Sequence, residues 1–227
     1  MQRLPILIRL ALLNGLLPIA TVAGCYSLSV MESYIPGCIP LLEGCTSISA
    51  AGRYGPSYWL FKAGMLPAAF FLARFWRQCH AWITELGAPR TSDLRAILVL
   101  GFVAAAFLVL YTVFLGSKGD IYSLLRRFGV TVYFSFTYLA QLLLTRRLRL
   151  LQESGRLKLP RYTTNHMLAV SIALLAIGLI SIPVGNLLDD KSNWQNIIEW
   201  NFALLMSIYF FLAWRAFRLL DVGRDPK

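Results

Sequence analysis

Four ionisable side chains stand inside long apolar runs of this sequence: Lys62, Arg126, Arg127 and Glu199. A charge at the centre of a bilayer costs about 2.5–3.5 kcal/mol, so such residues usually face the interior of a helix bundle and have partners. Counted from the ends of their runs, all four lie at nearly the same membrane depth. Three cations and one carboxylate at one depth have the chemistry to hold a phosphate or carboxylate group.

A structural role is the alternative explanation for these charges. Lys and Arg side chains near a helix end extend toward the membrane interface, and Glu199 can fix the contact between two helices. We expect Glu199 to lie within ion-pair distance of Arg126, Arg127 or Lys62, because pairing offsets part of the desolvation cost. Neighbouring residues on a helix diverge by about 100°, so one arginine should pair while the other faces the cavity mouth or lipid.

Hydroxyl residues precede the second apolar run, where Ser47, Ser49 and Arg53 are followed by Pro56. One interpretation is a turn that begins a helix, since Ser and Pro suit the first helical positions. The other is a loop folded back over the bundle, with the two hydroxyls and Arg53 facing a ligand or lipid headgroup. We therefore count Ser47, Ser49 and Arg53 among the candidate ligand-binding residues.

The fourth apolar run has an unusually polar side. Two sets of residues follow helical spacing on adjacent faces: Ser123, Arg127, Thr131, Ser135 and Tyr138 on one, and Tyr133, Thr137 and Gln141 on the other. A helix with so polar a side belongs in the bundle interior. It either lines a cavity or interlocks with the region of Asn14 and Pro18 in the first run.

Six apolar runs must position these residues. Hydrophobic residues make up 57% of the 227 residues and charged residues 15%, against about 25% charged in soluble domains. Because about 20 apolar residues cross a bilayer, the sequence predicts an all-α integral membrane bundle of six transmembrane helices, with residues 1–227 as a single domain. The expected spans are Leu4–Leu28, Ser57–Trp76, Arg95–Leu115, Ile121–Leu144, His166–Leu188 and Gln195–Arg218.

Basic residues are concentrated on one side of this arrangement. Sixteen of the 22 Lys and Arg residues fall there, whereas the loops of the other side hold Arg53, Lys118 and Lys191. The positive-inside rule places both termini in the cytoplasm, in a membrane that we expect to be a bacterial cytoplasmic membrane. The net charge of +11 then reflects topology and contact with anionic lipid headgroups, so membrane lipids and not nucleic acids are the expected partners.

Familiar catalytic motifs are missing from the sequence. It has no P-loop, dinucleotide fingerprint or metal-binding motif. His80 and His166 fall on the cytoplasmic side, away from the outer serines and the outer cysteines, which disfavours a Ser-His-Asp set, a zinc site and a haem site. We therefore expect no metal and no cofactor, and we assign no catalytic residue.

Two cysteines stand in the longest outer loop, residues 32–56. Cys38 and Cys45 flank a turn with Pro and Gly, so we predict a disulfide on the oxidising side of the membrane. It would stabilise the protein by about 2–3 kcal/mol. Two unpaired thiols are the alternative, and Cys25 is a third candidate partner.

The first run poses a separate question, because its residues 22–25 resemble a lipoprotein cleavage box. Arg9, Asn14 and Pro18 interrupt the apolar stretch before that box, so we expect a retained first helix. Asn14 and Pro18 then suit close contacts between helices.

The layout resembles that of the DRAM-like superfamily, which includes autophagy modulators and GPI-anchor lipid-remodelling proteins. The residues that carry the resemblance are Ser47, Ser49, Gly52, Pro56 and Tyr58, then Arg126-Arg127 with Gly129, and Glu199-Trp200. The resemblance implies a six-span membrane protein associated with lipid handling.

The leading functional hypothesis is a non-enzymatic, lipid-interacting membrane protein with a polar site in the outer leaflet. An integral membrane enzyme acting on lipid acyl or headgroup esters is the main alternative. A small transporter is a weaker one, since the sequence shows no inverted repeat.

Overall fold

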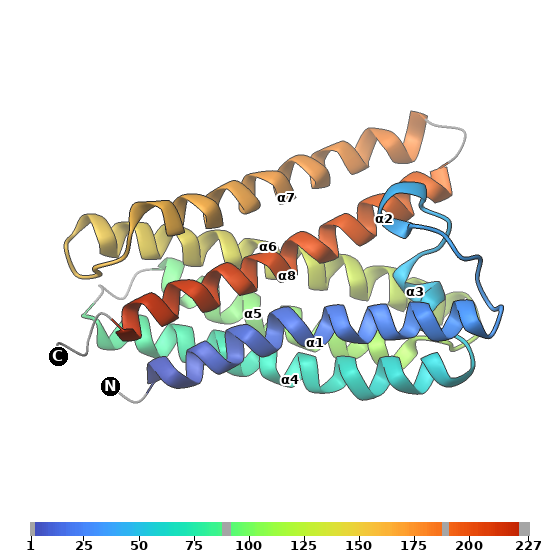
Figure 1. Ribbon diagram of the computed structural model, residues 1–227, viewed down its shortest axis with the longest axis horizontal. Coiled ribbons are helices and arrows are strands. Elements are labelled where there is room, and N and C mark those ends of the chain that lie inside the picture. The colour runs from blue at the N-terminus through green and yellow to red at the C-terminus, as the bar shows by residue number, and fades with distance from the viewer. Residues whose placement is uncertain (1–2, 88–91, 188–190, 223–227) are drawn as a thin grey trace.

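The computed structural model describes residues 3–87, 92–187 and 191–222, and within them helix is the only regular secondary structure (Figure 1). This confirms the predicted all-α class. The long helices are α1 (Arg3–Met31), α4 (Gly55–Glu85), α5 (Ser92–Phe114), α6 (Asp120–Glu153), α7 (Arg161–Leu187) and α8 (Lys191–Val222), and the short ones are α2 (Pro40–Glu43) and α3 (Ile48–Ala51).

Five of the long helices are long and apolar enough to cross a membrane. They are α1, α5 and α6, with α7 over Arg161–Ser181 and α8 over Ser192–Val222. Helix α4 does not reach the same apolar character, since Lys62 and Arg74 interrupt its stretch. The structure therefore suggests an integral membrane protein with five candidate spans, and α4 as a sixth span stays a prediction.

Successive long helices run in opposite directions along one bundle. The first residues of α1 and the last residues of α8 lie at the same end, here called the terminal end (Figure 1). Helices α2 and α3 lie at the opposite end, here called the loop end. Helix α1 packs against both α4 and α8, α5 packs against α4 and α6, and α7 packs mainly against α8.

Small residues let these helices approach closely. A Cβ atom on Gly64 of α4 would lie 2.0 Å from the hydroxyl oxygen of Thr21 in α1, and one on Gly101 of α5 would lie 2.2 Å from the Trp76 ring of α4. Asn14 of α1 donates to the carbonyl of Phe71 in α4 at 3.2 Å. Small residues and interhelical hydrogen bonds of this kind hold helices together in lipid.

The terminal half of the bundle is filled by large rings. Phe75, Trp76, Tyr209 and Phe217 are all less than 2% exposed and come from α4 and α8. Phe75 contacts both Trp76 and Phe217 edge to face, a favourable geometry for aromatic pairs. The loop half is packed differently, because cavities open there.

Candidate functional site

A polar cavity of about 990 Å³ opens in the loop half of the bundle. Helix α6 forms one wall, α7 and α8 form the other, and α3 contributes residues at the loop end. The charged and polar side chains that line it are Ser47, Ser49, Arg53, Ser123, Arg126, Arg127, Thr131, Ser135, Tyr138, Ser181, Gln195, Asn196 and Glu199.

The predicted polar side of α6 faces this cavity. The whole stripe takes part: Ser123, Arg127, Thr131, Ser135 and Tyr138. From Ser123 to Leu139 the wall is about 24 Å long at 1.5 Å per residue. The opposite wall on α7 is apolar, with Leu174, Leu175 and Leu179. One side of the cavity therefore suits polar groups and the other suits hydrocarbon.

The adjacent face of α6 has two surroundings: Thr137 and Gln141 are buried among the helices, and Tyr133 lines a second pocket together with Asn14 and Pro18 of α1. Gln141 donates to the Met206 carbonyl at 3.2 Å, and the Tyr209 hydroxyl donates to the Gln141 carbonyl. Cavity lining, one of the two alternatives that the sequence left open, therefore holds for both faces, and Gln141 also links the second face to α8.

Three arginines surround the polar cavity in different ways. Arg126 donates to the Ser117 carbonyl at 2.6 Å and to the Phe114 carbonyl at 3.5 Å, which satisfies carbonyls at the end of α5. Arg127 is exposed on α6. The buried Nε of Arg53 has no hydrogen-bond partner among the described residues, so at least one guanidinium donor here is left unused.

Glu199 is the only carboxylate among the described residues that line the polar cavity. Its carboxylate faces the backbone N–H of Ile48 at the start of α3. Within the described residues, no Lys or Arg nitrogen lies within 4.0 Å of the Glu199 carboxylate. The ion pairs found there join Arg3 to Glu85, and Asp93 to Arg146 and Arg147.

The predicted ion pair of Glu199 is therefore wrong. Arg126 is turned away toward the carbonyls of α5, and Arg127 makes no ion pair with Glu199. Lys62 lies elsewhere, since it lines neither cavity and its Nζ is 4.2 Å from the ring centroid of Tyr58, one turn nearer the loop end. The Lys62 side chain thus extends toward the end of its helix, which is the structural role that the sequence analysis gave as the alternative to ligand binding.

The two serines hold the loop as well as lining the cavity. Ser47 caps α3 by accepting from the backbone N–H of Ala50 at 3.0 Å. The hydroxyls of Ser49 and Tyr111 are 2.8 Å apart, which links α3 to α5. Pro56 lies in the first turn of α4, as the turn interpretation expected, although α4 has no side-chain cap; the loop also folds back over the bundle through the contact of Ser49 with Tyr111.

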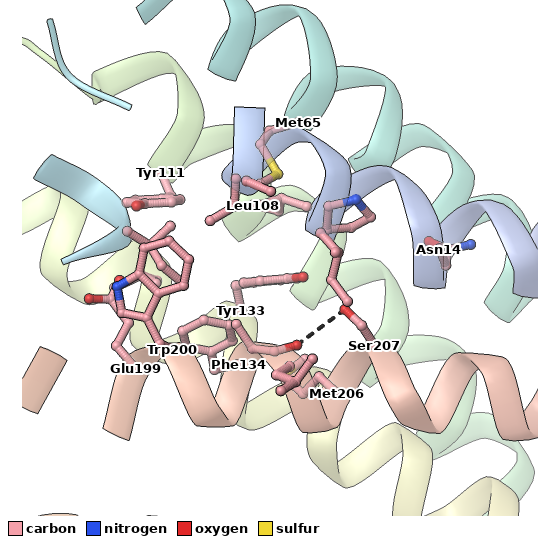
Figure 2. Close-up of a pocket in the computed structure, with 18 of the residues that line it drawn as sticks. Asn14, Met65, Leu108, Tyr111, Tyr133, Phe134, Glu199, Trp200, Met206 and Ser207 are labelled. Carbon is pink, nitrogen blue, oxygen red and sulfur yellow. Dashed lines mark hydrogen bonds between the residues drawn. The ribbon is translucent and has the colours of Figure 1, made fainter. Parts of the chain in front are cut away.

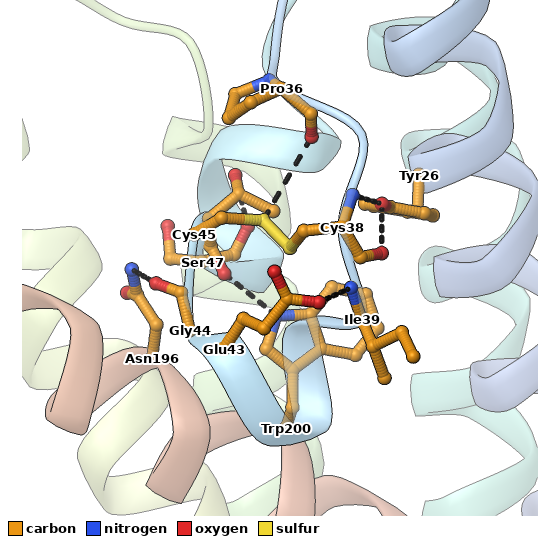
Figure 3. Close-up of a disulfide and its surroundings, with 11 residues drawn as sticks. Tyr26, Pro36, Cys38, Ile39, Glu43, Gly44, Cys45, Ser47, Asn196 and Trp200 are labelled. Atoms are coloured by element: carbon orange, nitrogen blue, oxygen red, sulfur yellow. Dashed lines mark hydrogen bonds between the residues drawn. A yellow bond between two sulfur atoms is a disulfide. The ribbon is translucent and has the colours of Figure 1, made fainter.

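The loop that carries α2 and α3 is fastened to α8 (Figure 3). Asn196, Trp200 and Asn201 donate to the carbonyls of Gly44, Thr46 and Leu41, at 2.7, 2.9 and 2.9 Å. Gly44 has φ +63°, and a Cβ there would lie 2.0 Å from the backbone oxygen of Asn193, so only glycine fits. Cys38 and Cys45 form a disulfide across the α2 turn, the pairing expected from the sequence.

A smaller, aromatic pocket of about 190 Å³ lies deeper in the bundle (Figure 2). Its ring-bearing walls come from four helices: Phe61 of α4, Tyr111 of α5, Tyr133 and Phe134 of α6, and Trp200 and Phe210 of α8. Val130, Phe134 and Glu199 line both cavities. Glu199 therefore stands at the boundary between the polar cavity and the aromatic pocket.

Sequence reasoning missed this pocket and the α8 tethers. The rings come from segments up to about 150 positions apart, and no local pattern relates them. Asn196 and Asn201 carry only a weak signal, as amides near the start of an apolar run.

Comparison of the chain with protein-family models, with curated proteins and with solved structures finds no match in any of the three.

Proposed function

We propose that this protein is a lipid-interacting integral membrane protein that binds a phosphate-bearing amphiphile in the polar cavity. The observation that carries the proposal is the composition of that cavity. Arg53, Arg126 and Arg127 line it with Glu199 as the only described carboxylate, opposite a wall of leucines. Guanidinium groups match the geometry of phosphate, and the leucines suit acyl chains.

The proposed orientation puts the loop end outside and both termini in the cytoplasm, with α4 as a sixth span. Exposed aromatic side chains at the loop end support a membrane interface there: Tyr54, Trp59, Tyr122 and Trp194. Helix α4 also exposes Leu66 and Phe70, as a lipid-facing helix does. The disulfide suits an oxidising outer side.

A labelling experiment tests this orientation. In a variant without other accessible cysteines, Ser192→Cys should react with a membrane-impermeant reagent on intact cells, and Ser154→Cys should stay protected. The reverse pattern would contradict the orientation.

The amphiphile is held, in this proposal, by charge at one end and hydrocarbon at the other. The phosphate contacts the cationic part of the α6 wall, and the chains lie along α7 and extend into the bilayer. The resemblance to the DRAM-like superfamily supports lipid handling in general. The protein acts as a binder of the lipid, without changing it.

Replacing Arg127 tests the proposal directly, because this side chain is exposed and lines the cavity. Arg127→Gln should bind short-chain phosphatidic acid about tenfold more weakly, the loss of one charge-assisted contact. Lys118→Gln is the matched control, since Lys118 is an exposed cation at the same end that does not line the cavity.

Native mass spectrometry of the protein in detergent measures the lipid bound to each variant. Equal binding by the wild type, Arg127→Gln and Lys118→Gln would show that the polar cavity is not the phosphate site. Release of fatty acid or headgroup during the incubation would instead favour the enzyme alternative.

A further inference from the structure

Glu199 has no cationic partner among the side chains that the structure describes. Its carboxylate lies at the boundary of the two cavities, and no Lys or Arg nitrogen of the described chain is within 4.0 Å. An unpaired carboxylate within a membrane-spanning segment is costly. Among the described residues it faces the backbone N–H of Ile48, which is a neutral group, so a positive ligand group would find a partner there.

The pocket on the inner side of Glu199 is built from aromatic rings. Tyr111, Tyr133, Phe134 and Trp200 line it together with Glu199 (Figure 2). The face of an aromatic ring attracts a cation, and several rings around one site form the usual cage for quaternary ammonium groups. An anionic carboxylate at the rim adds to this attraction.

Contacts between rings hold this cage in place. The ring centroids of Trp200 and Tyr26 are 5.9 Å apart in an edge-to-face contact. The centroid distances are 5.7 Å between Tyr111 and Phe61 and 5.4 Å between Phe134 and Phe202. The Nε1 of Trp200 is also fixed to the Thr46 carbonyl at 2.9 Å. The rings are therefore positioned before any ligand arrives, which lowers the entropic cost of binding.

The chemistry of the pocket favours a quaternary over a primary ammonium group. A primary ammonium has three N–H donors that need acceptors. Most of the side chains that line the pocket, such as Val22, Phe61 and Leu108, have no acceptor atom to offer such donors. A quaternary ammonium needs no hydrogen bond. At about 190 Å³ the pocket is below the 300–1,000 Å³ usual for drug-sized ligands, which suits a small group.

We infer that the aromatic pocket binds the quaternary ammonium end of a zwitterionic phospholipid headgroup, with Glu199 as its counter-charge. The arginines of the neighbouring polar cavity hold the phosphate of the same headgroup, and this half of the inference rests on the proposed function. The two cavities share Glu199 and Phe134, so adjacent groups of one headgroup reach both.

Three probes separate the two halves of the site. Short-chain phosphatidylcholine carries both groups, phosphatidic acid carries only the phosphate, and an alkyltrimethylammonium amphiphile carries only the cation. The wild type should bind phosphatidylcholine about tenfold more tightly than phosphatidylglycerol of the same chain length, because only the former carries the ammonium group. This comparison needs no variant.

Each variant should weaken the binding of some probes and leave the binding of the others unchanged. Glu199→Gln should abolish the preference for phosphatidylcholine and weaken the alkyltrimethylammonium probe about tenfold, while phosphatidic acid binds at least as well as before. Tyr133→Leu should weaken the same cationic probe, and Arg127→Gln should weaken only the two phosphate-bearing probes. Thermal unfolding confirms that each variant is folded.

Failure of the ammonium site and failure of the phosphate site would give different binding results. A wild type that binds phosphatidylglycerol as tightly as phosphatidylcholine, or a Glu199→Gln variant that keeps the preference, overturns the ammonium site. Binding of phosphatidic acid that depends on Arg127 then still supports the phosphate site. Conversely, binding of the cationic probe that depends on Glu199, without any binding of phosphatidic acid, supports the ammonium site and overturns the proposed function.

Discussion

The two ends of the bundle use arginine in opposite ways. At the terminal end, Arg3 pairs with Glu85, and Arg146 and Arg147 pair with Asp93. At the loop end, Arg53, Arg126 and Arg127 form no ion pair within the residues that the structure describes. Paired charges at the first end join helices, whereas those at the second line a cavity without a carboxylate partner among the described residues.

The ends also differ in how space is filled. Large rings such as Trp76 and Phe217 close the terminal half, while the loop half holds cavities of about 990 and 190 Å³. Binding sites need such incompletely filled regions, and a tightly filled half gives them a stable frame. Substitutions at the two ends should therefore affect different properties.

The largest expected effect lies at the terminal end. Asp93→Asn leaves the buried side chain of Arg147, which is 7% exposed, without its counter-charge. Loss of the partly exposed carboxylate that faces this buried cation should lower the free energy of unfolding by about 3 kcal/mol, measured by thermal or denaturant unfolding in detergent. Glu85→Gln is the control, since its pair with Arg3 is exposed and should contribute less than about 1 kcal/mol. Equal losses would remove the distinction between buried and exposed pairs.

An intermediate effect is expected from the disulfide at the loop end. Replacing both Cys38 and Cys45 with Ser should lower stability by about 2.5 kcal/mol, because the unfolded chain regains the freedom of the short closed loop. Thermal unfolding with and without a reducing agent measures it. The reducing agent should destabilise the wild type and leave the double variant unchanged; an effect on both would point to another cause.

The smallest expected effect on stability is that of Glu199→Gln. Since no cation within 4.0 Å depends on Glu199 in the described chain, the change should lower stability by less than about 0.5 kcal/mol, and removal of an unpaired charge acts in the stabilising direction. It should change ligand binding instead, the reverse of Asp93→Asn. A loss of several kcal/mol in the same unfolding assay would mean that Glu199 has a structural partner and would weaken the comparison between the two ends.

Much of this arrangement follows from local patterns in the sequence. Apolar runs long enough to cross a bilayer locate the long helices, because backbone hydrogen bonds in lipid must be satisfied within a segment. The spacing of Ser123, Arg127 and Thr131 locates the polar side of α6, since residues three and four apart share a helix face. Cys38 and Cys45 are close enough in the chain for their pairing to be expected.

Tertiary structure alone decided what these faces meet. Depth along a helix does not define rotation about its axis, so Lys62 and Glu199, which the sequence predicted at one level, face different surroundings. The aromatic pocket joins rings from α4, α5, α6 and α8, and its existence depends on how four helices pack. Hydropathy and spacing are properties of single segments and determine the helices and their polar sides, whereas partners and cavities are properties of several segments together.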